Sequence, residues 1–271
     1  MNHCTFSREE MYLNYNIPSK VSGKLLKYYP VRDYHLEAFL KDELFFARPT
    51  VLNDSFDVSG KLIEPYPRFK TRIGWNSEKA SILSEHGICS FIEAKSVDSE
   101  RMWSFYADNF DGFAIEFDPQ PFLSGKYAPA ILKKVKYLQA PLNLDDNCLR
   151  ITISDDSFRI RDLENDLGKY GDRIFHCLHL TKSCSWKEEN EWRMIMGNRA
   201  INKAFKRNAT RTGYSLTIER SIYKKLYIGY RVSKEKQLIL RDIAQEKGMN
   251  CYMVEPVIRS RKWTIDIQTL P

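Results

Sequence analysis

Short segments of the chain alternate apolar with polar residues, and others are apolar runs bounded by turn residues. Alternation with a period of two is typical of a strand with one buried face, and a short apolar run is typical of a fully buried strand. The segment "GFAIEFD" has the first pattern and "GICSFIEA" the second. We predict strands at residues 24–31, 87–94, 112–118, 130–138, 191–196, 224–232, 251–258 and 262–270.

Other segments carry apolar residues three or four positions apart, the spacing that places side chains on one face of a helix. In residues 33–49, Asp33 is the candidate helix cap, and four apolar residues have this spacing: Leu36, Phe39, Leu40 and Leu44. Ser99 is the candidate cap of a second helix. We predict helices at residues 33–49, 99–109, 157–183 and 233–248, and a loop rich in Asn, Asp, Ser and Gly at 52–60.

These helices and strands do not alternate strictly, which argues against a doubly wound parallel sheet. The predicted fold class is α+β, with mixed, mainly antiparallel sheets and flanking helices. Residues 1–23 are polar and are predicted to form an N-terminal arm, and residues 24–271 a single domain. The sequence of that domain contains no internal repeat and no low-complexity linker.

The composition adds a core and a class of partner to this picture. Of the 271 residues, 43% are hydrophobic and 13% aromatic, enough for a substantial core. The formal net charge of +7 favours an anionic partner such as nucleic acid or a nucleotide. The six cysteines have no paired spacing and are expected to be reduced thiols. Because the sequence has no signal-peptide pattern and no apolar run near the roughly 18 residues of a membrane helix, we expect a soluble cytoplasmic protein without a membrane partner.

The segment "WKEENEWRMIM" places Glu189 and Glu191 two positions apart. In a strand this spacing directs both carboxylates to the same face, where like charges repel. One interpretation is a solvated strand edge on which Arg193 neutralises its neighbour. The other is a pair of carboxylates in a cleft, which stabilises a developing cation. One member of such a pair has a raised pKa and can hydrogen-bond or accept a proton.

A basic stretch between residues 197 and 225 combines cations with Phe205 and Tyr214. This composition suits single-stranded nucleic acid, through phosphate contacts and base stacking, or else a solvated face of the protein. The cations predicted to bind nucleic acid are Lys203, Lys206, Arg207 and Arg211.

Trp103 and Tyr106 share one face of the helix predicted at 99–109, either as core residues or as one wall of a cleft that holds a flat ring. Gly112 would permit a tight turn from this helix into the next strand. The "HCLH" segment offers two histidines as zinc donors, but a structural zinc site needs a second pair of ligands at regular spacing. We therefore predict no metal. The sequence also has no glycine-rich phosphate loop and no Gly-x-Ser-x-Gly elbow.

Four stretches together resemble a family of bacterial proteins labelled domain of unknown function 2971. They are "LLKYYPV", "LNDSFD", "MWSFYADNFDGFAIEFD" and "WKEENEWRMI", and the resemblance extends from about Leu25 to the C-terminus. The last stretch has the family's Trp-x-x-Glu-x-Glu-x-Arg pattern, at Trp186, Glu189, Glu191 and Arg193. Ser55 departs from the family, in which proline is commoner, so the loop around it is expected to be less rigid.

The order of elements is also similar, more distantly, to that of ADP-ribosyltransferases. This resemblance implies an ADP-ribosyltransferase-like fold with NAD as co-substrate. In that superfamily a first strand carries a ring-holding residue, a second strand a serine motif, and a later strand Glu-x-Glu. The corresponding residues here are Lys27, Tyr28 or Tyr29, then Ser90, then Glu189 and Glu191.

The resemblance also implies roles for these residues. Glu191 would bond the ribose hydroxyls and stabilise an oxocarbenium-like centre, and Glu189 would orient or deprotonate the acceptor. The tyrosines of the first strand or Tyr106 could stack on nicotinamide. Further contacts to the dinucleotide are expected from Asn53 and Trp103.

Toxin-like transferases of this kind resemble proteins of toxin–antitoxin and phage-defence systems. The function implied is a mono-ADP-ribosyltransferase toxin that modifies nucleic acid, with RNA preferred to DNA and protein as the second choice. An antitoxin partner is implied, with a chaperone as a further candidate. Two alternatives stay open: a non-catalytic nucleic-acid-binding or sensor protein, in which the glutamates only complete an ion network, and an NAD glycohydrolase, in which water is the acceptor.

Overall fold

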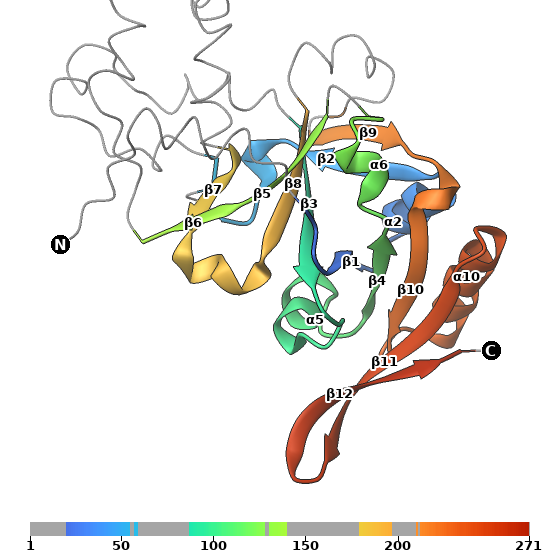
Figure 1. The fold of residues 1–271 in the computed structure, drawn as a ribbon. Coiled ribbons are helices and arrows are strands. Elements are labelled where there is room, and N and C mark those ends of the chain that lie inside the picture. Colours follow the sequence, from blue (N-terminus) through green and yellow to red (C-terminus); the bar gives the residue numbers. More distant parts are fainter. Residues whose placement is uncertain are drawn as a thin grey trace, which may run out of the picture.

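The protein is represented by a computed structural model, which describes residues 20–54, 57–58, 87–127, 130–139, 179–196, 210 and 212–270. Strands from the whole of this described part form one ten-stranded sheet (Figure 1). Its strands are β1 (Lys24–Pro30), β2 (Glu43–Ala47), β3 (Gly87–Ala94), β4 (Gly112–Phe117), β5 (Ile131–Lys134), β8 (Glu191–Met196), β9 (Gly213–Thr217), β10 (Tyr223–Gly229), β11 (Asn250–Arg259) and β12 (Lys262–Thr269).

The strands of this sheet follow one another in the order β12-β11-β10-β4-β1-β3-β2-β9. Strands β1 and β2 share one edge of β3, β8 pairs with the opposite edge, and β5 pairs with β8. Only the β10–β11 pair of this sheet is parallel; the other described pairs are antiparallel. A separate two-stranded parallel sheet is formed by β6 (Lys136–Leu138) and β7 (Thr181–Ser183).

The helices that cover the large sheet are short, apart from the last. They are α2 (Asp33–Leu40), α5 (Glu100–Tyr106), α6 (Gln120–Leu123) and α10 (Lys234–Glu246), with the 3-10 helices η1 (Pro49–Val51), η4 (Cys184–Glu189) and η5 (Arg220–Ile222). No helix in the described part of the chain is long and apolar enough to cross a membrane.

Successive residues of the central strand β1 point to opposite faces of the sheet, and both faces are buried. Leu25 belongs to one core, to which α2, α6 and α10 contribute apolar residues. Leu26 and Tyr28 belong to a second core on the other face, with Trp103 of α5. A mainly antiparallel sheet with helices on both faces confirms the α+β prediction.

Most predicted strands are confirmed, since β1, β3, β4, β8, β10, β11 and β12 lie at the expected places. The strand predicted at 130–138 is divided at Val135 into β5 and β6. The helix predicted at 99–109 is confirmed as α5, which ends earlier, at Tyr106, before the positive φ values of Asp108 and Asn109. Ser99 caps it by accepting a hydrogen bond from the Met102 amide. The tight turn expected before Gly112 is present, since α5 ends at Tyr106 and β4 begins at Gly112. A Cβ at Gly112 would lie 2.4 Å from the backbone oxygen of Tyr29 and 2.7 Å from that of Ala107, so the close packing requires glycine.

The helix predicted at 33–49 is wrong beyond Leu40. Asp42 takes a positive φ of 60°, which ends the helical run, and Leu44 lies in strand β2. Asp33 does not cap the helix, because the N-cap position is occupied by Arg32. Of the helix predicted at 157–183, residues 157–178 lie outside the described part, and residues 181–183 form strand β7. The sequence pattern also misses β9, which lies in the basic stretch.

Candidate active site

Glu189 and Glu191 flank a sharp change in the direction of the backbone. Glu189 is the last residue of η4, and Glu191 is the first of β8. Asn190 between them is left-handed, with φ 47° and ψ 49°, a conformation that asparagine adopts more readily than most residues. The single strand for both glutamates, which the distant resemblance implies, is therefore wrong, whereas the strand predicted at 191–196 is confirmed. The turn still brings the two carboxylates together.

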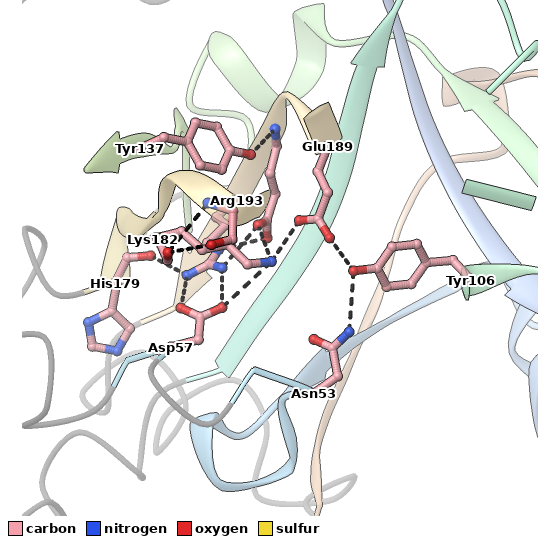
Figure 2. A network of polar contacts seen from close by, with 11 residues as sticks. Asn53, Asp57, Tyr106, Tyr137, His179, Lys182, Glu189 and Arg193 are labelled. Atoms are coloured by element: carbon pink, nitrogen blue, oxygen red, sulfur yellow. Dashed lines mark hydrogen bonds and ion pairs between the residues drawn. The ribbon is translucent and has the colours of Figure 1, made fainter. Parts of the chain in front are cut away.

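Lys182 on β7 joins these two carboxylates (Figure 2). Its ammonium nitrogen lies 2.6 Å from Glu189 Oε2 and 3.2 Å from Glu191 Oε2. The same nitrogen lies 4.8 Å from the centre of the Trp186 ring. Lys182 thus contacts three of the four residues in the Trp-x-x-Glu-x-Glu-x-Arg pattern.

Arg193, the fourth residue of the pattern, holds Glu191 from the other side. Its Nε lies 2.7 Å from Glu191 Oε1 and its Nη2 3.0 Å from Oε2, a bidentate pair. The guanidinium also donates to both carboxylate oxygens of Asp57 and, at 2.8 Å, to the backbone oxygen of His179. Asp57 is thereby drawn into the same group of charges.

We call the five charged residues Asp57, Lys182, Glu189, Glu191 and Arg193 the acidic cluster, because its ion pairs join three carboxylates to two cations. Each of these side chains is at most 5% exposed. The interpretation of a solvated strand edge is therefore wrong. The part of that interpretation in which Arg193 neutralises a neighbouring glutamate is correct, since Arg193 pairs with Glu191.

The surroundings shift the pKa values of the two glutamates in opposite directions. Burial opposes the ionisation of Glu191, but Arg193 and Lys182 outweigh burial and lower its pKa to about 2. Burial raises the pKa of Glu189, and the attraction of Lys182 offsets this only in part. Such a separation suits one carboxylate that stays ionised and another that can take up a proton.

Tyr106 and Asn53 connect Glu189 with the surface. The Tyr106 hydroxyl donates a hydrogen bond to Glu189 Oε1, and Asn53 Nδ2 donates to the Tyr106 hydroxyl at 3.3 Å (Figure 2). Tyr106 is half-buried and Asn53 is exposed. These two residues, both predicted to contact a dinucleotide, thus form the outer edge of the acidic cluster.

Ser90 and Lys27, predicted from the first two strands of the site, also lie nearby. Ser90 stands opposite Arg193 in the β3–β8 pair, and its side chain hydrogen-bonds Glu191. Lys27 Nζ donates to the backbone oxygen of Ser90 at 2.9 Å. Lys27 therefore contacts the strand that carries the serine, whereas Ser90 contacts the cluster itself.

The aromatic residues predicted to hold a ring lie elsewhere, with the exception of Tyr106. Trp103 is 0% exposed and packs edge-on against Tyr28, with their ring centroids 5.3 Å apart. Tyr29 points to the opposite face of the sheet, where it stacks on Phe113 at 5.1 Å. The structure thus corrects the cleft-wall interpretation of Trp103 and places Tyr28 and Tyr29 in the core or against it, because the alternation of β1 and the packing of α5 direct these rings inward.

Glu93 forms a second buried acidic site, which we call the Glu93 anchor. Oε1 accepts hydrogen bonds from the Ser22 amide at 2.6 Å, the Ser22 hydroxyl at 2.7 Å and the Gly23 amide at 3.1 Å. Oε2 accepts from Lys134 Nζ at 2.8 Å and Trp192 Nε1 at 2.9 Å. The last residues of the predicted N-terminal arm are therefore bound to β3.

The Glu93 anchor also fixes the turn between the two glutamates. Asn190 Nδ2 donates to the Glu93 backbone oxygen at 2.6 Å, and the Glu93 amide donates to the Asn190 backbone oxygen at 3.1 Å. Burial alone would raise the pKa of Glu93, but the hydrogen bonds from Lys134, Trp192 and Ser22 outweigh it and hold the pKa well below its ordinary value.

The sequence analysis missed Lys182, Asp57 and Glu93. Lys182 falls at the end of a predicted helix, and Glu93 looks like an ordinary residue of a strand. Asp57 belongs to the "LNDSFD" stretch, whose composition predicts a loop but gives no indication that Asp57 pairs with Arg193. The cations Lys203, Lys206, Arg207 and Arg211 lie outside the described residues. Within the described part of the chain, no group of three or more His, Cys, Asp or Glu residues could hold a metal ion.

Residues 102–194 match the family described as "Protein of unknown function (DUF2971)". The match supports this part of the expected resemblance and covers Tyr106, Lys182 and the Trp-x-x-Glu-x-Glu-x-Arg pattern. The stretches "LLKYYPV" and "LNDSFD" lie outside it. No curated protein and no solved structure gives a significant match to the chain.

Proposed function

We propose that the acidic cluster is the active site of an NAD-dependent mono-ADP-ribosyltransferase whose acceptor is nucleic acid, with RNA preferred to DNA. The observation that carries the proposal is the pair of neighbouring glutamates on one lysine, with the pKa of Glu191 lowered and that of Glu189 raised. Perturbed, coupled carboxyl groups in a buried site are typical of catalytic centres.

The proposed reaction needs both kinds of carboxylate. The bond between the nicotinamide nitrogen and ribose C1′ breaks, and its electron pair leaves with nicotinamide. A nucleophilic atom of the acceptor base forms the new bond to C1′, and the proton that this atom loses passes to Glu189. Ionised Glu191 stabilises the positive charge that develops on the sugar, an effect that is strongest in a site that excludes water.

The charges of the cluster favour a cationic group on the substrate. Three carboxylates meet two cations in its ion pairs, and the nicotinamide ring of NAD carries a positive charge. Tyr106 offers an aromatic ring, and Asn53 an amide, at the exposed edge beside Glu189. We assign to these two residues the contact with the dinucleotide.

The test uses the purified full chain, free of partner proteins, with NAD labelled in its adenylate portion and with separate pools of RNA, DNA and protein. We expect label to be transferred to RNA, and Glu191→Gln to lower the rate roughly 100- to 1,000-fold. Glu189→Gln should also lower it, by roughly 100-fold or more, because the acceptor loses its base. Glu188→Gln is the matched control, since Glu188 is 72% exposed and, within the described part of the chain, forms its ion pair with Arg101 on the surface.

Thermal unfolding of each variant accompanies the assay, because Glu191 is buried and its loss also affects stability. Absence of transfer to any pool, with the acidic cluster intact, would contradict the proposal. Loss of NAD without a labelled macromolecule would instead identify a glycohydrolase with water as the acceptor.

A second candidate is a non-catalytic nucleic-acid-binding protein in which the acidic cluster is structural. The specific observation in its favour is that both oxygens of Glu191 are already bound, one by Arg193 and the other by Arg193 and Lys182. In that case Glu191→Gln would lower stability and leave the biological phenotype of the folded protein unchanged.

The biological setting is proposed on the resemblance alone. We place the enzyme in the cytoplasm, as a toxin of a toxin–antitoxin or phage-defence system, with an antitoxin protein and a chaperone as candidate partners. Co-purification of the chain with the product of a neighbouring gene, and restored growth when both are expressed, would test this setting.

A further inference from the structure

Strands β11 and β12 form a long hairpin whose tip extends beyond the rest of the described domain (Figure 1). The strands are joined by Ser260 and Arg261, with φ values of 50° and 61°. Two residues with positive φ are typical of the short turns that connect twisted strands, where Asn-Gly is favoured. Arg261 therefore adds a cation at a position where it costs about 1 kcal/mol of conformational strain.

One face of this hairpin is apolar and becomes more exposed toward the tip. Its cross-strand pairs are Val254 with Ile267, Pro256 with Ile265, and Ile258 with Trp263. Val254 is fully buried, whereas Ile258 is 66% and Trp263 86% exposed. The paired strand fixes the backbone position of this indole, but most of its apolar surface is in contact with water rather than with other side chains.

The tip is also basic. Between Pro256 and Ile265 the sequence has three cations, Arg259, Arg261 and Lys262, and no acidic residue. All three are exposed. Arg259 forms an ion pair at 2.8 Å with Asp266, further along the hairpin. Arg261 and Lys262, the two residues that precede Trp263, form no salt bridge with the described part of the chain.

We infer that the β11–β12 tip is a docking site for single-stranded nucleic acid. A base stacks on the indole of Trp263, and Arg261 and Lys262 contact the adjoining phosphates. Exposed aromatic rings beside cations are the arrangement by which proteins bind single strands without reading sequence. The inference rests on the proposal that the acceptor is nucleic acid, and it adds a site far in sequence from the basic stretch at 197–225.

Charge complementarity favours this occupant over a protein. Protein interfaces are depleted in lysine, whereas the segment between Pro256 and Ile265 carries Arg259, Arg261 and Lys262 and no acidic residue, a charge that complements a chain of phosphates. An anionic lipid surface would also attract cations beside tryptophan. The tip, however, places Arg259 and Lys262 as a cross-strand pair on the hairpin face opposite to Ile258 and Trp263, because successive residues alternate faces. A flexible single strand can wrap from one face to the other, and a flat membrane cannot.

The test measures binding of a fluorescently labelled single-stranded RNA of about 15 nucleotides to the full chain, without NAD, by fluorescence anisotropy over a series of salt concentrations. Trp263→Ala should weaken binding roughly 5- to 150-fold, the loss of one stacked base. Tyr34→Ala is the matched control, because Tyr34 is an aromatic residue that is 64% exposed on α2. It should leave the affinity unchanged.

The charge test replaces Arg261 and Lys262 together by glutamine. Binding should weaken, and the slope of log affinity against log salt should become shallower by roughly 1.4, as two phosphate contacts are lost. Lys234→Gln, an exposed lysine on α10, is the control for removal of a surface charge. Equal effects of Trp263→Ala and Tyr34→Ala would overturn the inference. So would binding to phosphatidylserine vesicles that depends on Trp263 while RNA binding does not.

Failure of this inference can be told apart from failure of the proposed activity. RNA binding that depends on Trp263, with no transfer from NAD, leaves the docking site standing and contradicts the transferase. Transfer to RNA at the same rate in Trp263→Ala, at RNA concentrations below saturation, contradicts the docking site and leaves the transferase standing.

Discussion

The Glu93 anchor and the acidic cluster are two buried acidic sites beside the paired strands β3 and β8, and they satisfy charge in different ways. Glu93 accepts hydrogen bonds from five neutral donors and one lysine. The cluster instead brings three carboxylates around Lys182 and Arg193. In the anchor the pKa of the carboxyl group falls, whereas in the cluster two carboxyl groups, Asp57 and Glu189, have raised pKa values because of burial.

This difference indicates a structural role for the anchor and a functional role for the cluster. A buried carboxylate surrounded by donors is a stable arrangement that ties distant segments together. Like charges brought together out of water are unfavourable, and they are expected where a substrate or a developing charge makes use of them. We therefore interpret the anchor as the support that positions the turn at Asn190, and the cluster as the candidate site of the proposed reaction.

Replacing Arg193 by methionine should have the largest effect on stability. The side chain keeps much of its volume but leaves Asp57 and Glu191 buried without their shared cation, which costs about 3–5 kcal/mol. Chemical denaturation of the variant and the wild type measures the difference in the free energy of unfolding.

Arg101→Met is the control for Arg193→Met. The Arg101–Glu188 pair has an N–O distance of 2.6 Å, close to the 2.7 Å of Arg193–Glu191, but it lies on the surface with side chains 47% and 72% exposed. Its loss should cost under about 1 kcal/mol. If Arg193→Met were as mild as this control, the cluster would not be a site of opposed buried charges, and the contrast with the anchor would disappear.

Glu93→Gln should have the next largest effect, about 1.5–3 kcal/mol at neutral pH, because several hydrogen bonds to a charged group are weakened and an amide hydrogen now faces other donors. The pH dependence has a definite sign. Since the folded-state pKa is lowered, the stabilisation is complete above the unfolded value of about 4.3 and is lost as the pH falls below it. Denaturation series between pH 7 and pH 2 should show the two proteins converging at the acid end.

Glu189 provides the opposite case for that series. Its folded-state pKa is raised, so its ionisation lowers stability as the pH rises through the interval between the unfolded and folded values. Glu189→Gln should remove this decline, whereas Glu93→Gln removes an increase. The same pH slope in both variants would mean that the two sites do not differ in the way their charges are held.

Local patterns were sufficient to predict most of the strands, although not β2, β7 and β9, and the family resemblance pointed to several residues of the site. Strand β4 is buried on both faces, although its alternation is typical of a strand with one buried face. Glu189, Glu191, Tyr106, Asn53 and Ser90 do lie in one connected group. The Leu44 error has a simple cause: apolar spacing does not record the positive φ of Asp42, so a turn between a helix and a strand looks like a continuous helix.

The partners of the glutamates depend on contacts that are distant in sequence. Asp57 and Arg193 are separated by 136 positions, and Trp192 and Glu93 by 99. No periodicity relates such residues, because their meeting is set by the pairing of β3 with β8 and by the position of the turn that carries Asp57. The burial of Trp103 has the same origin, since one helix face can serve a core or a cleft, and only the packing of α5 on the sheet decides between them.

Substitutions at Asn190 should have the smallest effect on stability and show what the anchor does for the cluster. Asn190→Gly keeps the left-handed backbone and loses the hydrogen bond to the Glu93 backbone oxygen. Asn190→Ala loses the same bond and adds strain, so it should be less stable than the glycine variant by about 1 kcal/mol. Denaturation of both variants isolates the contribution of the turn.

If the turn is what brings the two carboxylates to Lys182, transfer from NAD should stay closer to the wild-type rate in the glycine variant than in the alanine variant. Equal rates in two variants of unequal stability would show that the carboxylates are positioned by Lys182 and Arg193 alone, and the anchor would then be a separate fastening of the N-terminal residues.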